Sequence, residues 1–230
     1  MHRFAAVLLL LCTAGSVGFS QAFQAGLDFM VGSPQREFRK NVDNVGVGIA
    51  GNIGFAPEGT PVMLGLEFGF MNYGSTDRRE PFSTTIPDVF VNVSTTNNFI
   101  LGHAILRLQP NTGSLRPYLQ GMVGFNYLFT ETKIENINVP GQEVASSNNL
   151  SDGAFSYGAG AGVLIWVYSP AEGDGLSDIF VDLGARYVFG GEAEYLKEGS
   201  IRSANGRVEY DILKSKTDLL VFHIGASVRF

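Results

Sequence analysis

The sequence predicts an all-β chain in which eight antiparallel strands close into an up-and-down barrel that spans a membrane. Apolar residues recur at every second position through most of the chain, which is the period of a β-strand. The connections between these segments alternate between short and long, as they do in an up-and-down barrel. Glycine supplies 29 of the 230 residues, well above the usual ~7%, and many glycines share one face of the strands.

The composition excludes several other classes of protein. Charged residues make up 17% of the chain and apolar residues 45%, so the chain has enough apolar surface to fold into a core. The longest apolar run, Phe4–Cys12, is too short for a spanning helix, which needs roughly 20 residues. A net charge of −6 leaves no basic surface for nucleic acid.

Residues 1–22 have the pattern of a secretory signal peptide. A short polar start precedes the apolar stretch Phe4–Leu11, and small residues stand at Ser20 and Ala22, where cleavage requires them. We therefore expect an exported protein whose barrel domain covers residues 23–230. Cleavage would remove the single cysteine, so we expect no disulfide in the mature chain.

Eight segments alternate between large apolar residues and small or polar ones. Each is about as long as the ~9–11 residues with which a tilted strand crosses the hydrocarbon layer. In the second segment, for example, Val47 and Ile49 alternate with Gly48 and Ala50. The predicted strands are Phe23–Val31, Val45–Ala56, Val62–Tyr73, Asn98–Leu108, Tyr118–Phe129, Phe155–Val167, Ile179–Phe189 and Leu220–Phe230.

The lengths of the connections predict which end of the barrel faces which compartment. Pro57–Pro61 is short, Gln109–Pro117 and Ser169–Asp178 are moderate, and the other four connections are long and polar. Outer-membrane barrels have short periplasmic turns and long extracellular loops, so an even number of strands puts both termini on the periplasmic side. Asn205-Gly206 in the longest loop is a hairpin signal, which predicts strands that project beyond the membrane.

The polar face of the strands distinguishes a membrane barrel from a soluble, lipocalin-like carrier. A soluble barrel must solvate its exterior, whereas here the face opposite the large apolar residues carries mainly Gly, Ala, Ser and Asn. All five lysines lie in the long loops. Small residues suit the crowded interior of an eight-stranded barrel, and large apolar residues suit contact with lipid.

The same alternation predicts that charged strand residues point into the barrel. Buried charges are tolerated when they are paired and hydrogen-bonded, so we expect a lumenal polar network that holds the barrel closed. A gate or a proton-sensitive plug is the alternative role. The residues of the predicted network are Asp28, Glu67, His103, Arg107, Asp182, Arg186, His223 and Arg229.

Aromatic residues gather near the predicted strand ends, as in the girdles that mark the two faces of a bilayer. The first girdle is predicted to contain Phe55, Tyr118 and Phe230. The second is predicted to contain Phe29, Phe70, Tyr127, Phe129, Tyr157, Tyr187 and Phe189.

With its signal peptide, eight alternating strands and aromatic C-terminal strand, the chain resembles the small outer-membrane β-barrels of the OmpA and OmpX kind. Arg116-Pro117-Tyr118, which opens a Gly-rich strand, is also common in such barrels. The resemblance implies that the last strand is read by the outer-membrane assembly machinery. Because the chain ends on this strand, we expect it to lack the peptidoglycan-binding domain of longer relatives. The residues that match the assembly signal are Phe222, Ile224, Ala226, Val228 and Phe230.

These observations predict a non-enzymatic integral outer-membrane protein, with a structural role or a surface-interaction role through its long loops. We expect a monomer that contacts membrane lipids, the assembly machinery and an extracellular ligand, with no catalytic residues, metal or cofactor. A narrow, gated, porin-like pore is one alternative. A lipid-modifying enzyme is another, but the sequence offers no Ser or Asp paired with His103 or His223, as a hydrolase would need.

Overall fold

The computed structural model describes residues 21–57, 59–83, 86–136, 143–169, 178–204 and 207–230. Eight antiparallel strands form a closed barrel, so the predicted fold class is confirmed. The signal-peptide prediction lies largely outside the described residues. In order around the wall, the barrel strands are β1 (Gln21–Pro34), β12 (Leu219–Arg229), β7 (Asp178–Gly190), β6 (Glu143–Tyr168), β5 (Leu115–Asn136), β4 (Ile86–Leu108), β3 (Val62–Ser83) and β2 (Gly46–Pro57).

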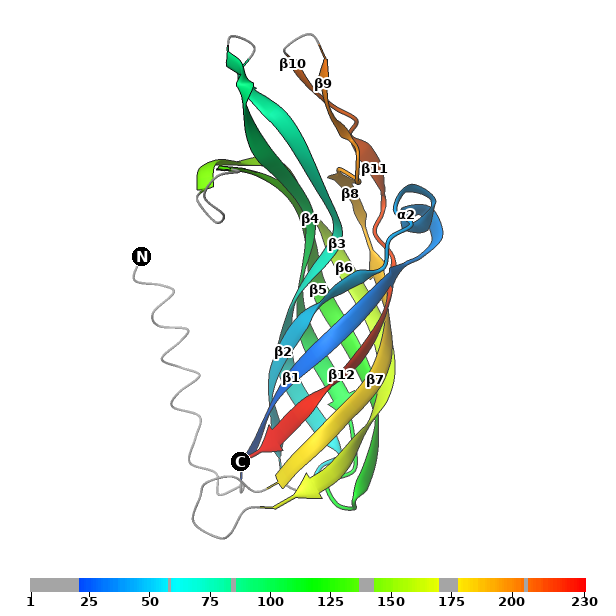
Figure 1. Cartoon of the computed structure of the whole chain (residues 1–230). Helices are drawn as coiled ribbons and strands as arrows, with labels where there is room; N and C mark the ends of the chain where they lie inside the picture. Colours follow the sequence, from blue (N-terminus) through cyan, green and yellow to red (C-terminus); the bar gives the residue numbers. More distant parts are fainter. Residues whose placement is uncertain (1–20, 58, 84–85, 137–142, 170–177, 205–206) are drawn as a thin grey trace, which may run out of the picture.

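The barrel closes where its first and last strands meet. β1 pairs with β12 from Gln24 opposite Arg229 to Pro34 opposite Leu219. β2, β4 and β6 end, and β3, β5 and β7 begin, at the end of the barrel where β1 starts and β12 ends; this is called the lower end here, and the opposite end the upper end (Figure 1). Closure leaves no barrel strand with an unpaired edge within the wall.

Four strands run far beyond the predicted spans. β3, β4, β5 and β6 have 22, 23, 22 and 26 residues. Among them, the β3–β4 pair rises highest above the barrel, and the upper ends of β5 and β6 bend outward to one side (Figure 1). Sequence alternation predicted only their lower parts, because the upper parts mix polar residues with short, mainly apolar stretches such as Phe90–Val93. A register shift between Asn72 and Gly74 in the β3–β4 pairing separates the two parts.

Successive residues point alternately to the two faces of the wall, as predicted. On β1, Leu27 is 65% exposed while Asp28 is 2% exposed. β4 also follows the predicted parity, since Phe99 and Leu101 are buried. The exposed exterior is an apolar belt that includes Leu27, Phe29, Ile49, Ile53, Leu64, Leu66, Phe68, Leu106, Leu119, Val123, Phe125, Phe155, Tyr157, Phe222 and Ile224.

Tyr118 is not part of an exterior girdle, so that prediction was wrong. It is 4% exposed, and it shares the inward parity of Gln120 on β5. The other members predicted for its girdle, Phe55 and Phe230, lie on the exterior. Position at a strand end therefore did not decide where this side chain points; the alternation of the strand did.

The long connections carry a second layer of structure. The β1–β2 connection contains a six-residue helix, α2 (Arg36–Asn41). Between β7 and β12, β8 (Glu192–Tyr195) pairs with β11 (Leu213–Lys216), and β9 (Ile201–Ala204) pairs with β10 (Arg207–Tyr210). These four strands form an upper arm on the far side of the opening from β4 and β5 (Figure 1). The predicted hairpin strands are therefore present, although Asn205-Gly206 lies outside the described residues.

α2 closes the upper end of the lumen with one aromatic side chain. Phe38 is fully buried and contacts Tyr195 edge-on, with ring centres 5.0 Å apart. Its ring also lies 5.8 Å from Tyr73 and 6.2 Å from Phe99. Within the described residues, α2 is the only helix, and none is long and apolar enough to cross a membrane.

Candidate functional site: the lumen and the upper cleft

A short ion pair crosses the middle of the lumen. Arg186 Nη1 on β7 donates to Glu67 Oε2 on β3 over 2.7 Å. The two strands lie on opposite sides of the barrel, and both side chains are almost fully buried. The pair therefore braces opposite walls of the barrel. A buried pair of this kind contributes chiefly because removing one partner leaves an uncompensated charge.

A second cluster joins four strands, β4, β5, β7 and β12, nearer the lower end. Arg107 Nη1 lies 3.5 Å from Asp182 Oδ2, and its guanidinium carbon lies 4.1 Å from the centre of the Tyr118 ring. The Tyr118 hydroxyl donates to Asp182 Oδ1 over 2.8 Å and lies 3.0 Å from His223 Nε2. Arg107 Nε also donates to Gln120 Oε1 over 3.0 Å. Tyr118 is the residue that links the charges of this cluster, and the sequence interpretation had placed it elsewhere.

Among the described residues, Asp28 and Arg229 make no hydrogen bond or ion pair with these two clusters. Asp28 accepts a hydrogen bond of 3.2 Å from Asn52 Nδ2. Arg229 stands at the lower end, where its Nη1 donates to the backbone carbonyl of Asn111 over 3.2 Å. The structure therefore does not join Arg229 to a carboxylate among the described residues.

Arg116, which was not predicted as a site residue, makes the ion pair at this end instead. Its Nη2 lies 3.3 Å from Asp178 Oδ2, and its guanidinium carbon lies 4.5 Å from the ring centre of Phe180. The sequence did contain a signal for it. Arg116 has the same parity as Tyr118 and Gln120 and should have been read as inward.

His103 does have a serine partner, contrary to the sequence interpretation. Its Nε2 lies 2.9 Å from Ser156 Oγ. The register explains how they meet across a strand: His103 lies opposite Gly124 on β5, and Gly124 lies opposite Ser156 on β6. Because glycine has no side chain, the imidazole can cross β5 and reach the hydroxyl.

His223 has an aspartate beside it, so the expectation that neither histidine has an acidic partner was also wrong. Its Nε2 lies 3.6 Å from Asp182 Oδ1. Neither histidine, however, faces an accessible surface that a lipid substrate reaches. Ser156 is 0% exposed and His103 is 2% exposed, so the histidine–serine pair is buried in the lumen.

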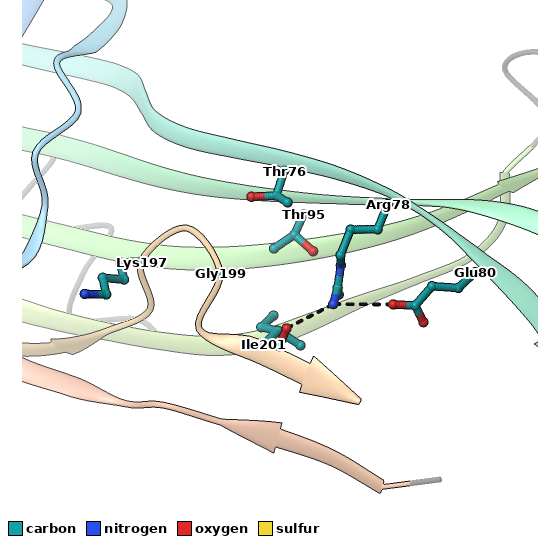
Figure 2. A pocket seen from close by; sticks show the side chains of 7 residues that line it. All are labelled: Thr76, Arg78, Glu80, Thr95, Lys197, Gly199 and Ile201. Carbon is teal, nitrogen blue, oxygen red and sulfur yellow. Dashed lines mark hydrogen bonds and ion pairs between the residues drawn. The ribbon is translucent and has the colours of Figure 1, made fainter. Parts of the chain in front are cut away.

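A cleft lies above the barrel, between the upper parts of β3–β6 and the upper arm. It consists of two adjoining cavities of about 370 Å³ and 300 Å³, which is the size of a small-ligand site. Both cavities are lined by Arg78, Glu80 and Ile201. Arg78 Nη1 donates to the carbonyl of Ile201 over 3.0 Å and lies 3.4 Å from Glu80 Oε1 (Figure 2). These contacts divide the cleft in two.

The two cavities differ in their lining. The first also contains Thr76, Thr95, Lys197 and Gly199 (Figure 2). The second contains the residues Val93, Thr132, Ile134, Ala145, Ser146, Ser147, Asn149 and Tyr210. The cleft therefore offers hydroxyl groups beside an apolar floor, a mixture that suits small amphipathic groups.

Removing the Tyr118 hydroxyl tests the cluster around Asp182. We expect Tyr118→Phe to lower the free energy of unfolding by about 1–3 kcal/mol, because Asp182 then loses a buried donor that nothing replaces. Urea unfolding followed by the fluorescence of Trp166, the single tryptophan, measures this change. Tyr127→Phe, on the outward face of the same strand, is the matched control. Equal stability of the two variants would contradict the role given to the hydroxyl.

Comparison with known proteins gives likenesses only among solved structures. No model of a protein family matches the sequence, and no curated protein does. Neisserial surface protein A (NspA) aligns over 91% of this chain and 95% of its own, with 12% identity and a TM-score of 0.38. Ail of Yersinia pestis, solved with the heparin analogue sucrose octasulfate, covers 91% and 97% with 14% identity and a TM-score of 0.35.

A third solved structure is the N-terminal β-barrel domain of Pseudomonas aeruginosa OprF, which covers 90% of this chain and 97% of its own. Its identity is 13% and its TM-score is 0.35. We base the architecture on the strand pairing, which closes eight antiparallel strands into one barrel. The chain thus has the eight-stranded up-and-down fold that the sequence resemblance implied.

Proposed function

We propose that this chain is a non-enzymatic integral outer-membrane β-barrel, with a lumen plugged by its own polar side chains and an upper end that serves surface interactions. The observation that carries this proposal is the contrast between the two faces of the barrel wall. Its exterior is an apolar belt, and its interior holds buried ion pairs. A protein dissolved in water would have to expose that belt, whereas lipid covers it without cost.

The filled lumen supports a structural role over a conducting one. Arg186 and Glu67 cross the middle of the lumen, and Phe38 covers its upper end. An eight-stranded barrel has an interior just wide enough for side chains to fill. The gate proposed as an alternative would require these contacts to break.

The upper cleft supports the surface-interaction role. Loops held on a rigid scaffold are where binding residues concentrate, and the extensions of β3–β6 hold one wall of the cleft in a paired sheet. An extracellular ligand would bind there. Outer-membrane lipids would contact the belt, and the assembly machinery would read the outward side chains of β12. The signal peptide and the monomeric state remain predictions.

Two measurements on the refolded protein test the proposal. In detergent, the unheated barrel should migrate differently from the boiled chain on an electrophoresis gel, because a closed barrel stays compact in the detergent. In planar bilayers, the inserted protein should give small conductance or none. Large, stable currents would contradict a lumen filled by Arg186 and Glu67, and identical migration before and after boiling would contradict a closed membrane barrel.

A further inference from the structure

We propose that Arg36, with Arg39 and Lys40 beside it, binds the phosphate group of an anionic lipid at the upper rim of the barrel. This inference rests on the proposed function, because it requires the barrel to span a membrane with the upper end at its outer face. The site lies outside the lumen and outside the cleft, on the helix that follows β1.

Arg36 lies at the depth where lipid headgroups meet the barrel. Its guanidinium carbon is 5.8 Å from the centre of the Phe189 ring. Phe189 stacks on Tyr157 with ring centres 5.3 Å apart, and the centre of the Tyr187 ring lies 4.6 Å from that of Phe189. Tyr157 is exposed on the exterior of the barrel. Exterior aromatic groups of this kind mark the membrane interface, so the guanidinium lies level with the phosphates.

The donors of Arg36 are available to a ligand. Its side chain is 68% exposed. Among the described residues, its one polar partner is Asp218, with Nε and Oδ2 3.8 Å apart. The Asp218 carboxylate already accepts hydrogen bonds from the Gly190 backbone N–H over 3.1 Å and the Tyr187 hydroxyl over 3.4 Å. The outer N–H groups of Arg36 are therefore free to bind a phosphate in bidentate fashion.

The local charge on α2 favours an anion. Arg39 and Lys40 stand in the last turn of the short helix that Arg36 begins, so three cations lie within six residues. Both are exposed, whereas Phe38 points into the barrel. The one acid of the helix, Glu37, accepts the Lys216 backbone N–H over 3.3 Å and is directed toward β11.

The acids near the site are Asp218, the exposed Asp43 that follows the helix, and two glutamates of the upper arm. Asp218, described above, is buried. Glu192 and Glu194 lie across the β8–β11 ladder from Lys216 and Lys214. Cross-strand pairs of opposite charge offset each other. α2 itself contains three cations and one acid, so the helix has a net positive charge.

The backbone at Arg36 supplies an independent observation. Its φ of 51° is the only positive value at a non-glycine residue in the described part of the chain. Glycine adopts this conformation freely, whereas a side chain at this position strains the backbone. An arginine here works against the local preference of the fold, and strain of this kind concentrates at positions that serve a ligand.

A lipid phosphate fits these features better than a soluble one. The site combines cations with an adjoining aromatic surface, and an amphipathic lipid can contact both at once, with its headgroup on Arg36 and its chains along the belt. A long cationic side chain at a membrane interface can keep its charged head in water while its apolar stem lies along apolar surface.

The experiment measures binding of bisphosphorylated lipid A to the detergent-solubilised barrel by native mass spectrometry. Arg36→Gly should weaken binding by roughly 3- to 10-fold, which corresponds to the loss of one charge-assisted contact at an exposed site. Its melting temperature should stay equal or rise, because glycine relieves the backbone. Arg36→Lys should retain part of the affinity, since it keeps the charge but loses the planar fork.

Arg79→Ala is the matched control, because Arg79 is another exposed arginine over an aromatic ring. Its guanidinium carbon is 4.8 Å from the Phe90 ring centre, in the upper extension. It should bind lipid A as the unmodified chain does. Unchanged binding in Arg36→Gly would overturn the inference, as would equal retention of zwitterionic phosphatidylcholine or displacement of lipid A by dilute inorganic phosphate. Migration before and after boiling is measured on the same samples. If the barrel still shows heat-modifiable migration, these results overturn the lipid site alone and not the membrane-barrel proposal.

Discussion

Replacing Glu67 by leucine is expected to lower the free energy of unfolding by about 3–5 kcal/mol, because Arg186 then stays buried without its carboxylate. The 2.7 Å contact between Arg186 and Glu67 joins opposite walls, so the loss affects the whole barrel and not one hairpin. Urea titration followed by Trp166 fluorescence, in detergent or in vesicles, gives the change in midpoint.

The double variant Glu67→Leu with Arg186→Leu separates loss of a pair from creation of an unpaired charge. Two apolar side chains of similar volume fill the same space without a charge, and we expect the double variant to recover most of the lost stability. If it were as unstable as Glu67→Leu alone, the ion pair would be contributing attraction that apolar packing does not replace.

Gly124→Ala is expected to have the second large effect. A Cβ built on Gly124 would lie 1.9 Å from the carbonyl oxygen of Gly102 on the adjoining strand, which is backbone and cannot turn aside. Strands β4 and β5 would have to separate locally, at a cost of about 1–3 kcal/mol or more. The methyl group would also stand between His103 and Ser156. The yield of heat-modifiable barrel on refolding, together with the urea midpoint, measures the effect.

Gly121 on the same strand supplies the control. A Cβ built there meets nothing within 4 Å, so Gly121→Ala should refold as the unmodified chain does. Comparable losses in both variants would mean that the effect comes from the conformational preference of alanine, and not from the close approach of the two strands.

The sequence was sufficient to predict the wall of the barrel. Large side chains such as Leu27 and Phe68 alternate with small or polar ones, and this alternation decides which side chains face outward. The same parity sends Asp28 and Glu67 inward without any knowledge of the fold. The prediction for Tyr118 was wrong because its place near a strand end was weighted above its inward parity.

The contacts within the lumen could not be predicted, because they depend on register. Alternation says that His103 points inward, but not which residues of β5 and β6 lie beside it. Once the pairing is known, Gly124 becomes the signal that explains how His103 reaches Ser156. Arg186 and Glu67 lie 119 positions apart in sequence, so no local pattern relates them.

The upper extensions were missed for a different reason. Above Asn72, β3 and its neighbours carry polar and apolar side chains together, and part of this sheet lines the cleft. Alternation there is short, as at Val91 and Val93, and the backbone pairing shows how far the strands continue. α2 was missed because six residues are too few to establish a helical period.

The seam between β1 and β12 has a consequence for the order in which the chain can fold. Gln24 Nε2 donates to Ser227 Oγ across this seam, and the two residues are 203 positions apart. Every other pair of adjacent wall strands consists of two wall strands that follow one another in the sequence. Each of these pairs can therefore form as soon as its second strand is present. The first strand alone must wait for the last. Until then the sheet keeps two open edges, and the slow step of assembly should be the long-range loop closure that joins them.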